Sequence, residues 1–215
     1  MIGNLYDKYV LPKLCDKCCA TKPINYQRKK VVPMASGSVL EIGIGSGLNI
    51  PFYDEAKIDK VIGLDPSEEL NVMAKELAIQ NNIDIEFIVD GAENISLEDN
   101  SIDTILITYT LCTIPLIEES TAEMKRVLKP SGKLIFCEHG IAPDHNIIKW
   151  QNRINPIWGK LFGGCNINRD IPKIILDAGF KMETIEQMYL PSTPKIVGYN
   201  YWGCLLYTSD AADDL

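Results

Sequence analysis

The sequence predicts an α/β fold with a mostly parallel sheet, and three observations lead to this prediction. An apolar run from Val39 to Ile42 ends in a turn that carries glycines at positions 43, 45 and 47. A second apolar run, from Lys60 to Asp65, ends in a carboxylate. Downstream, strand-like and helix-like segments alternate, which is the pattern of parallel strands joined by helical crossovers.

The elements follow from hydrophobic periodicity and from turn and capping signals. Strands are expected at 38–42, 60–65, 85–89, 104–109 and 133–138, followed by a terminal hairpin of 180–189 and 195–202. Helices are expected within residues 2–30, from about Asn49 or Pro51, after Ser67, and at 117–128, 147–154 and 170–179. Ser67 is the expected N-cap of its helix. The face that this helix should bury consists of Leu70, Met73, Ala74 and Leu77.

The first two strand ends form a candidate nucleoside pocket. Glycines after a buried strand allow backbone N–H groups to approach a ligand without an intervening Cβ. Asp65, at the end of the next strand, can accept hydrogen bonds from both hydroxyls of a ribose. The two features together indicate a site for an adenosine-containing ligand.

The glycine spacing narrows the choice of ligand. A dinucleotide-binding fold requires G-x-G-x-x-G, whereas this chain has G-x-G-x-G followed by Leu48 and Asn49. Glu41 lies just before the turn, where its charge would repel a pyrophosphate and tolerate an amine. S-adenosylmethionine carries an adenosine, a sulfonium and an ammonium, and it has no phosphate. The residues therefore favour this cofactor over NAD.

Four segments in order carry a resemblance to a known family. They are Val39-Leu-Glu-Ile-Gly-Ile-Gly-Ser-Gly47, Gly63-Leu-Asp-Pro-Ser67, Asp99-Asn-Ser-Ile-Asp103 with the apolar run after it, and Arg126-Val-Leu-Lys-Pro-Ser-Gly-Lys133. Over residues 36 to 140 the chain resembles the class I S-adenosylmethionine-dependent methyltransferases. The resemblance implies a Rossmann-like sheet of seven strands, mostly parallel with a terminal antiparallel hairpin and helices on both faces.

Further segments resemble one subgroup of that family. They are Leu111-Cys112, Phe136-Cys-Glu-His-Gly140, Trp150-Gln-Asn-Arg153 and Gly163-Gly-Cys165 followed by Arg169-Asp170. These are similar to membrane-associated thiol S-methyltransferases, with bacterial phospholipid N-methyltransferases and quinone-pathway C-methyltransferases as wider relatives.

The resemblance also implies the cofactor contacts. The glycine turn should pass under the methionine part, with Glu41 orienting the ammonium directly or through water. Asp65 should bind the ribose, and the adenine should lie between the Pro66–Ser67 and Ala92–Glu93 segments. Many relatives carry an acid where this chain has Gly91, and Asp90 stands one residue earlier. The full expected set is Glu41, Gly43, Gly45, Gly47, Asn49, Asp65, Pro66, Ser67, Ala92, Glu93 and Thr108.

Three residues are candidates for the chemistry. His139 follows a strand end and is either a general base or a structural histidine. Tyr109 either borders the sulfonium or belongs to the core, and Cys165 either lines the acceptor pocket or is a loop thiol without a role. Methyl transfer is an in-line displacement at carbon, so the protein contributes chiefly by holding nucleophile, methyl group and sulfur in line.

The sequence does not choose the methyl acceptor. The aromatic, mostly uncharged character of residues 140–169 favours a small apolar or lipid-like molecule, with a thiol, an amine or a quinol as the accepting group. Two other classes of function stay open. One is a non-catalytic protein that binds the cofactor, and the other, disfavoured by the glycine spacing, is an NAD-dependent oxidoreductase.

Charge and cysteine content exclude other partners. The formal net charge of −8 argues against a nucleic-acid partner, and Arg28-Lys-Lys30 is expected to be a solvated surface turn. The seven cysteines include one C-x-x-C-C cluster, Cys15 to Cys19, without a second ligand pair to complete four ligands. We therefore expect reduced thiols and no bound metal.

Residues 5–19, in the N-terminal leader, are relevant to where in the cell the protein is found. Tyr6, Val10, Leu11 and Leu14 are compatible with one apolar face, so residues 5–19 are either a lid on the substrate side or an interfacial membrane helix. The lid is favoured because Pro12 divides any long helix. We expect a cytoplasmic protein, with peripheral membrane contact as the alternative; the sequence makes no prediction of oligomeric state.

The domain organisation is expected to be simple. Residues 1–204 should form one methyltransferase domain, with 1–35 as a helical leader or lid and 140–169 as an insertion over the active site. Residues 205–215 match one translated frame of a common sequencing adapter. We expect this tail to be an assembly artefact and exclude it from the fold prediction.

Overall fold

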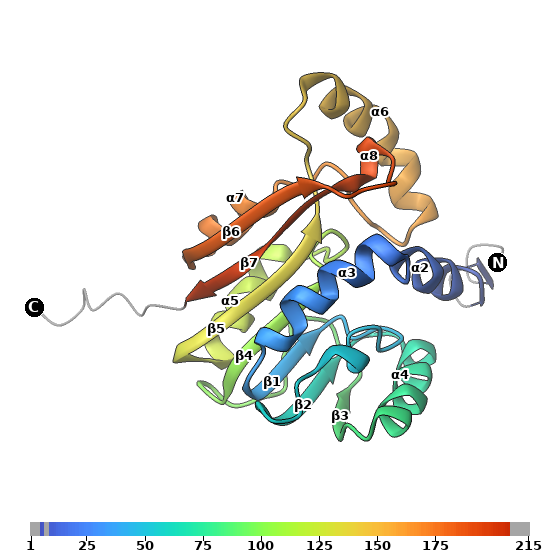
Figure 1. The fold of residues 1–215 in the computed structure, drawn as a ribbon. Helices are drawn as coiled ribbons and strands as arrows, with labels where there is room; N and C mark the ends of the chain where they lie inside the picture. The colour runs from blue at the N-terminus through green and yellow to red at the C-terminus, as the bar shows by residue number, and fades with distance from the viewer. Residues whose placement is uncertain (1–4, 7–8, 207–215) are drawn as a thin grey trace, which may run out of the picture.

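The computed structural model describes residues 5–6 and 9–206, and within them seven strands form one sheet in the order β3-β2-β1-β4-β5-β7-β6 (Figure 1). Strands β1 to β5 run parallel, and β7 is antiparallel to both β5 and β6. The fold class predicted from the sequence is confirmed. The strands are β1 (Gly37–Ile42), β2 (Ile58–Leu64), β3 (Ile85–Ile88), β4 (Ile102–Thr108), β5 (Leu128–His139), β6 (Lys181–Tyr189) and β7 (Tyr199–Leu206).

Helices cover both faces of the sheet, as the two apolar clusters show. On one face, Val31 of α3 and Ala74 of α4 pack with Val39 and Leu106. On the other, helices α5 and α7 pack over the alternate residues of the same strands. The helices are α2 (Leu11–Cys19), α3 (Lys22–Val31), α4 (Glu68–Asn81), α5 (Ile117–Val127), α6 (His145–Leu161), α7 (Ile171–Asp177) and α8 (Lys195–Gly198), with 3₁₀ turns η1 (Val32–Met34) and η2 (Ile50–Phe52).

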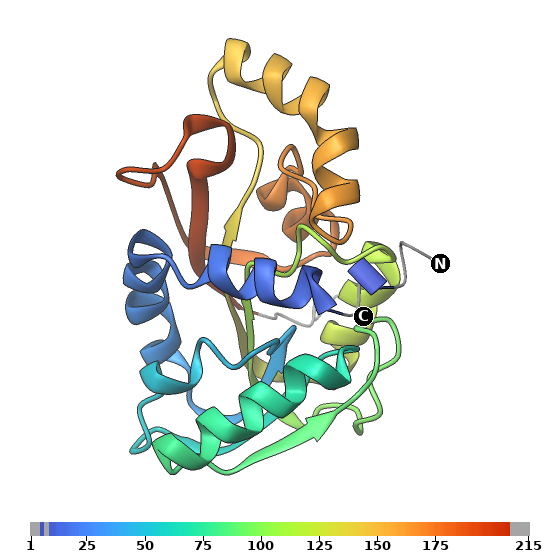
Figure 2. The same cartoon turned by 90° about the vertical axis from the view of Figure 1, so that its right-hand side faces the viewer.

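The carboxyl ends of the parallel strands share one edge of the sheet, and in open α/β sheets this edge binds ligands. In Figure 2, which shows the molecule from this side, α2 crosses the view between α6 above and α4 below. The leader therefore lies beside the loops that follow β1, β2 and β4. None of the helices in the described part of the chain is both long enough and apolar enough to span a bilayer.

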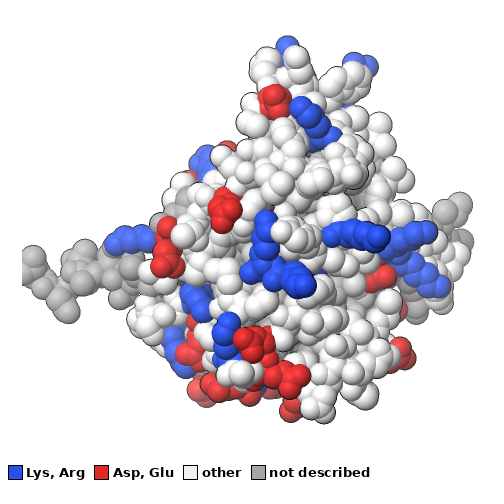
Figure 3. All heavy atoms as spheres, in the orientation of Figure 1, with Lys and Arg blue, Asp and Glu red and all other residues white. Residues whose placement is uncertain are grey.

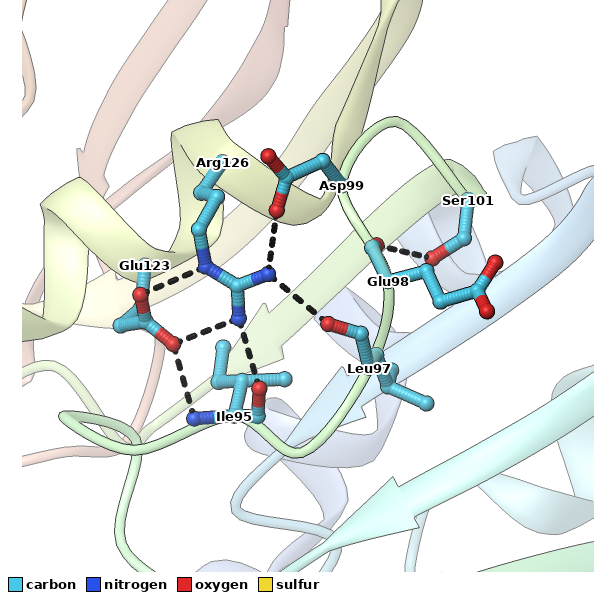
Figure 4. Close-up of polar contacts among 7 residues, drawn as sticks. All are labelled: Ile95, Leu97, Glu98, Asp99, Ser101, Glu123 and Arg126. Carbon is cyan, nitrogen blue, oxygen red and sulfur yellow. Dashed lines mark hydrogen bonds and ion pairs between the residues drawn. The ribbon is translucent and has the colours of Figure 1, made fainter.

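Arg126 on α5 ties the loop before β4 to the helix (Figure 4). Its guanidinium donates to Glu123 and Asp99 and to the carbonyl oxygens of Ile95 and Leu97, at 2.7–2.8 Å. These contacts hold the loop that precedes β4 against α5.

Several helix predictions need correction. Instead of a helix from Asn49 or Pro51, the chain makes only the 3₁₀ turn η2, because Tyr53 returns to an extended conformation (ψ 142°) and directs its hydroxyl to Glu41. Helix α6 is longer than the predicted 147–154 and runs through Pro156. In α4, Met73 is exposed and Asn71 is buried instead, where its amide donates to the Asp65 carbonyl oxygen.

The last strand also differs from the prediction at both of its ends. Residues 195–198 form the short helix α8, so β7 begins only at Tyr199. The strand continues through Leu205, which is fully buried and pairs with Leu134 of β5, and ends at Leu206. Both residues belong to the tail that is expected to be an artefact; the remainder of that tail, 207–215, lies outside the described residues.

Candidate active site

A cavity of about 970 Å³ lies at the carboxyl edge of the sheet. This is near the upper end of the range for small-molecule sites. One end is formed by the glycine turn after β1 and by Asp65, and the other by Cys112, His139 and Cys165. Helices α2 and α3 contribute Leu11, Asp16 and Arg28 to its wall.

The glycine turn has the conformation that its sequence predicts. Gly43 and Gly47 have φ values of +70° and +83°, a region that side chains disfavour. A Cβ on Gly43 would collide with Thr110, and one on Gly47 would lie 3.1 Å from the Ala74 Cα of α4. Gly43 thus allows the loop after β4 to come close, while Gly47 allows α4 to pack under the turn.

Asp65 is held at the cavity by two backbone donors. Its carboxylate accepts from Gly45 N at 3.0 Å and from Ser67 N at 2.9 Å. The side chain is largely buried, and this burial raises the pKa of Asp65 above its usual value although both hydrogen bonds oppose the shift. A fixed carboxylate beside the glycine turn is a suitable acceptor for a ribose diol.

The residues expected to flank the adenine also line the cavity. Pro66 and Ser67 lie on one side, and Ala92 and Glu93 lie on the segment after β3. Asp90 lines the cavity too, with its carboxylate accepting from Gly91 N and from the Asn94 amide, both at 2.8 Å.

Glu41 and Asn49 belong to a buried polar network beneath the turn. Glu41 accepts from Asn49 Nδ2 at 2.9 Å and from the Tyr53 hydroxyl at 2.5 Å. Burial raises the pKa of Glu41 to about 7, while the bonds from Tyr53 and Asn49 and the charge of Arg28 oppose this rise. Glu41, Asn49 and Gly47 do not line the cavity, so the structure does not bring them to the ligand side with the other predicted residues.

Arg28 requires the largest correction to the sequence analysis. The Arg28-Lys-Lys30 run was expected to be a solvated turn, yet Arg28 is only 4% exposed and points inward from α3. Its Nη1 donates to Asn49 Oδ1 at 2.7 Å and to Thr108 Oγ1 at 2.5 Å, and its guanidinium lies 5.2 Å from the Tyr109 ring centroid. No carboxylate of the described residues forms a salt bridge with it, and its Nε has no partner.

The three candidates for the chemistry lie together at the end of the cavity lined by Cys112, His139 and Cys165, which is called the acceptor end below because the methyl acceptor is expected there. His139 Nε2 lies 3.3 Å from Cys165 Sγ, and the His139 ring stacks on Tyr109 at a centroid distance of 6.5 Å. Tyr109 has a left-handed φ of +56° and donates its hydroxyl to Asn200. Trp158 Nε1 donates to Cys165 Sγ at 3.4 Å, so residues from α6 close this end.

Sequence reasoning missed Arg28, Asp16 and Cys112 as site residues. Asp16 accepts from the Ser46 hydroxyl, which places a leader carboxylate beside the glycine turn. Nothing in the sequence distinguishes Arg28 from Lys29 and Lys30, and its burial beside Gln27 and Val31 on one face of α3 becomes evident only in the structure. Cys112 belongs to the Leu111-Cys112 segment of the family resemblance, but no neighbouring residue in the sequence indicates that it contacts Cys165.

Comparisons with known proteins agree with this geometry. Residues 40–136 match the family model described as a methyltransferase domain. Thiol S-methyltransferase TMT1A of Homo sapiens is 30% identical over 176 residues, which span 80% of this chain and 71% of that protein. Thiol S-methyltransferase TMT1B of Rattus norvegicus is 33% identical over 170 residues, spanning 75% and 69%.

Solved structures agree on the fold. A SAM-dependent methyltransferase from Aquifex aeolicus superposes with a TM-score of 0.63 at 19% identity, covering 92% of this chain and 98% of that one. The chain belongs to the class I S-adenosylmethionine-dependent methyltransferases, and its cofactor is S-adenosylmethionine. Within this class its sequence is similar to the thiol S-methyltransferases.

Proposed function

We propose that this enzyme transfers the methyl group of S-adenosylmethionine to the sulfur of a small apolar thiol. The observation that carries the proposal is the composition of the cavity, which continues from Asp65 and the glycine turn to a sulfur-rich, aromatic end around Cys165 and Trp158. The similarity to thiol S-methyltransferases supports the same acceptor class.

The carboxylate and the ammonium of the methionine part each have an oppositely charged side chain on the cavity wall. Arg28 is a buried cation with a free Nε, and a buried cation is costly unless it is paired. We propose that it binds the carboxylate of the methionine part and that Asp16 binds the ammonium. Glu41 does not touch the cofactor in this arrangement. It accepts a hydrogen bond from Asn49, and Asn49 in turn accepts one from Arg28 and so positions the guanidinium. Asp65 binds the ribose.

These contacts would place the sulfonium near Thr108 and Tyr109 at the end of β4, facing the acceptor end. The sulfonium loses its charge in the transition state, so an acceptor end with little water favours the transfer. Trp158 and Phe162, stacked with ring centroids 4.1 Å apart, provide such a surface beside Cys165. Transfer in line then needs only that the acceptor sulfur is held at contact distance from the methyl carbon.

A panel of acceptors tests the proposal. Purified enzyme is incubated with methyl-labelled S-adenosylmethionine and with matched thiols, amines and quinols of similar apolar bulk. We expect label on the thiols and at least ten-fold less on the others. Label on a quinol or an amine alone would replace the thiol assignment, and cofactor binding without any transfer would favour a non-catalytic binding protein.

A lipid-like acceptor is the second candidate. A phosphatidylethanolamine N-methyltransferase of Cereibacter sphaeroides is 29% identical, over 48% of this chain and 51% of that protein. The apolar wall at the acceptor end, which includes Leu11 and Ile114, suits an acyl chain as well as an apolar thiol. The amine arm of the panel, offered in vesicles, separates the two acceptors.

We also propose a peripheral membrane contact through residues 5–19. Tyr9 is 58% exposed and Ile157 of α6 is 65% exposed, and the Tyr6 hydroxyl donates to the Leu161 carbonyl oxygen, which joins the two segments. Basic side chains gather over α2 and α3 on the face shown in Figure 3, a distribution that suits anionic headgroups. Co-sedimentation with anionic but not neutral vesicles is the expected result, and equal recovery with both would contradict it.

A further inference from the structure

Two cysteines and one histidine at the acceptor end form a cluster with the dimensions of a metal site. Cys112 Sγ, His139 Nε2 and Cys165 Sγ all lie within 4.8 Å of one another. Cys165 Sγ is 3.7 Å from Cys112 Sγ and 3.3 Å from His139 Nε2. All three residues line the cavity.

These separations can be compared with those of a tetrahedral zinc site. With Zn–S bonds of about 2.3 Å and Zn–N bonds of about 2.0–2.1 Å, two ligand sulfurs lie about 3.8 Å apart, and a sulfur and a nitrogen about 3.6 Å apart. The observed 3.7 Å and 3.3 Å are within a few tenths of an ångström of these values. Cys112 Sγ and His139 Nε2 lie within 4.8 Å of each other, so these two atoms would have to approach by up to about 1.2 Å when an ion binds.

Surrounding contacts hold the two cysteine-bearing segments in place. Arg169 donates to the carbonyl oxygens of Leu111 and Ile114, which fixes the turn that carries Cys112. Asn166 N donates to the Cys112 carbonyl oxygen at 2.9 Å, which joins that turn to the loop of Cys165. These contacts position the two cysteine ligands; the Nδ1 of His139 has no hydrogen-bond partner among the described residues.

The N–H of Trp158 also points at Cys165 Sγ. A hydrogen-bond donor directed at sulfur stabilises a thiolate, the form in which cysteine binds metal. The competing interpretation is a set of weak hydrogen bonds between reduced side chains, as the same distances allow. The two interpretations differ in whether the purified protein binds a thiophilic ion with one fixed stoichiometry.

We propose that Cys112, His139 and Cys165 bind one zinc ion and that its open fourth position faces the cavity and receives the acceptor thiol. Three protein ligands with one open position are the arrangement of catalytic zinc, and Cys₂His is one of its ligand sets. This inference rests on the proposed function, because it deepens the choice of a thiol as acceptor.

Methyl transfer at this site would begin with the acceptor thiol bound to zinc. The acceptor thiol binds zinc as a thiolate and its proton passes to solvent, since a coordinating thiol is deprotonated. A lone pair of this sulfur forms the new S–CH₃ bond as the bond from the methyl carbon to the cofactor sulfonium breaks. The electron pair of the broken bond stays on the cofactor sulfur, which becomes a neutral thioether. The methylated acceptor is also a neutral thioether, a poorer ligand than a thiolate, and leaves.

Metal binding is tested without reference to activity. The full chain is purified under reducing conditions, stripped with a chelator and titrated with zinc, and the metal content is measured by mass spectrometry. We expect one zinc per chain and, after exchange for Co²⁺, the thiolate charge-transfer and ligand-field bands of a tetrahedral site. Cys112→Ser and Cys165→Ser should each lower zinc affinity at least ten-fold, whereas Cys18→Ser, in the leader cluster, should not.

The methylation assay then separates this inference from the proposed function. Chelation should lower thiol methylation at least ten-fold, zinc should restore it, and S-adenosylmethionine binding should stay unchanged. Thiol methylation that continues in a zinc-free protein overturns the metal site and leaves the function standing. One bound zinc without thiol methylation supports the metal site and removes the thiol acceptor. A Cys112–Cys165 disulfide in a protein that binds no zinc overturns the inference.

Discussion

The two ends of the cavity are built in different ways. The cofactor end is made by short contiguous segments at the ends of β1 and β2, where Gly45 N donates to Asp65 across only 20 residues. The acceptor end joins Cys112 to Cys165 across 53 residues and depends on helix α6 for Trp158. The first can therefore be recognised in a motif, whereas the second exists only once the chain has folded. Substitutions of Arg28 and Glu41 test whether the cofactor end depends on tertiary contacts as strongly as the acceptor end does.

Arg28→Leu should have the largest effect. It removes the buried cation proposed to pair with the cofactor carboxylate, and we expect S-adenosylmethionine binding to weaken by about 3 kcal/mol, as for a lost charge-assisted pair. Calorimetric titration measures this change. Lys29→Leu, on the exposed side of the same helix, is the matched control and should leave the dissociation constant unchanged. Equal losses in both variants would remove Arg28 from the cofactor site.

Glu41→Gln should change how stability depends on pH. Because burial raises the folded-state pKa of Glu41 to about 7, the folded chain binds this proton more tightly than the unfolded chain does. The contribution of Glu41 to stability is therefore greatest below about pH 4.3, the usual value for glutamate, and is lost as the pH rises to about 7. Between pH 5 and 8 the loss should be roughly 2–3 kcal/mol.

Urea unfolding at several pH values measures this dependence. The wild-type free energy of unfolding, minus that of Glu41→Gln, should fall as the pH rises. Glu76→Gln, an exposed substitution on α4, should reproduce the wild-type profile. A flat difference between wild type and Glu41→Gln would mean that Glu41 is solvated and does not hold Asn49 from a buried position.

Asp65→Ala should weaken cofactor binding by roughly 1.5–3 kcal/mol, the scale of losing hydrogen bonds to a charged group. Asp59→Ala changes an exposed acid toward the other end of the same strand and should have no effect. An unchanged dissociation constant for Asp65→Ala would show that the ribose binds elsewhere. The assignment of the cofactor end from the sequence motif would then be wrong.

Ser67→Ala should have the smallest effect. The Ser67 side chain accepts from Leu70 N at 3.2 Å and caps α4, and the loss of such a cap costs about 1 kcal/mol. Chemical denaturation measures the change in the free energy of unfolding, with Ser101→Ala, in the loop before β4, as a comparison. A change in cofactor affinity larger than the change in stability would show that Ser67 contacts the adenine.

Most of the fold could be predicted because the information is local. Alternating apolar runs, the Ser67 cap and the glycine turn each act within a few residues, so the alternation of strands and helices and the position of Asp65 could be predicted. The seven-stranded sheet with its terminal antiparallel hairpin was implied by the family resemblance. The errors occurred where tertiary contacts override a local signal. Tyr53 ends η2 by reaching Glu41, and Asn71 replaces Met73 in the core because Asp65 provides a backbone acceptor.

The sequence by itself determined the α/β class, the cofactor and the carboxylate at the second strand end, since each depends on residues that are neighbours in the chain. Only the tertiary structure decided that Arg28 is buried, that Glu41 lies below the cavity, and that Cys112, His139 and Cys165 meet. The physical reason is that burial and side-chain proximity depend on which distant segments pack together. The sequence around a charged run or an isolated cysteine does not indicate which distant residue will lie next to it in the folded protein.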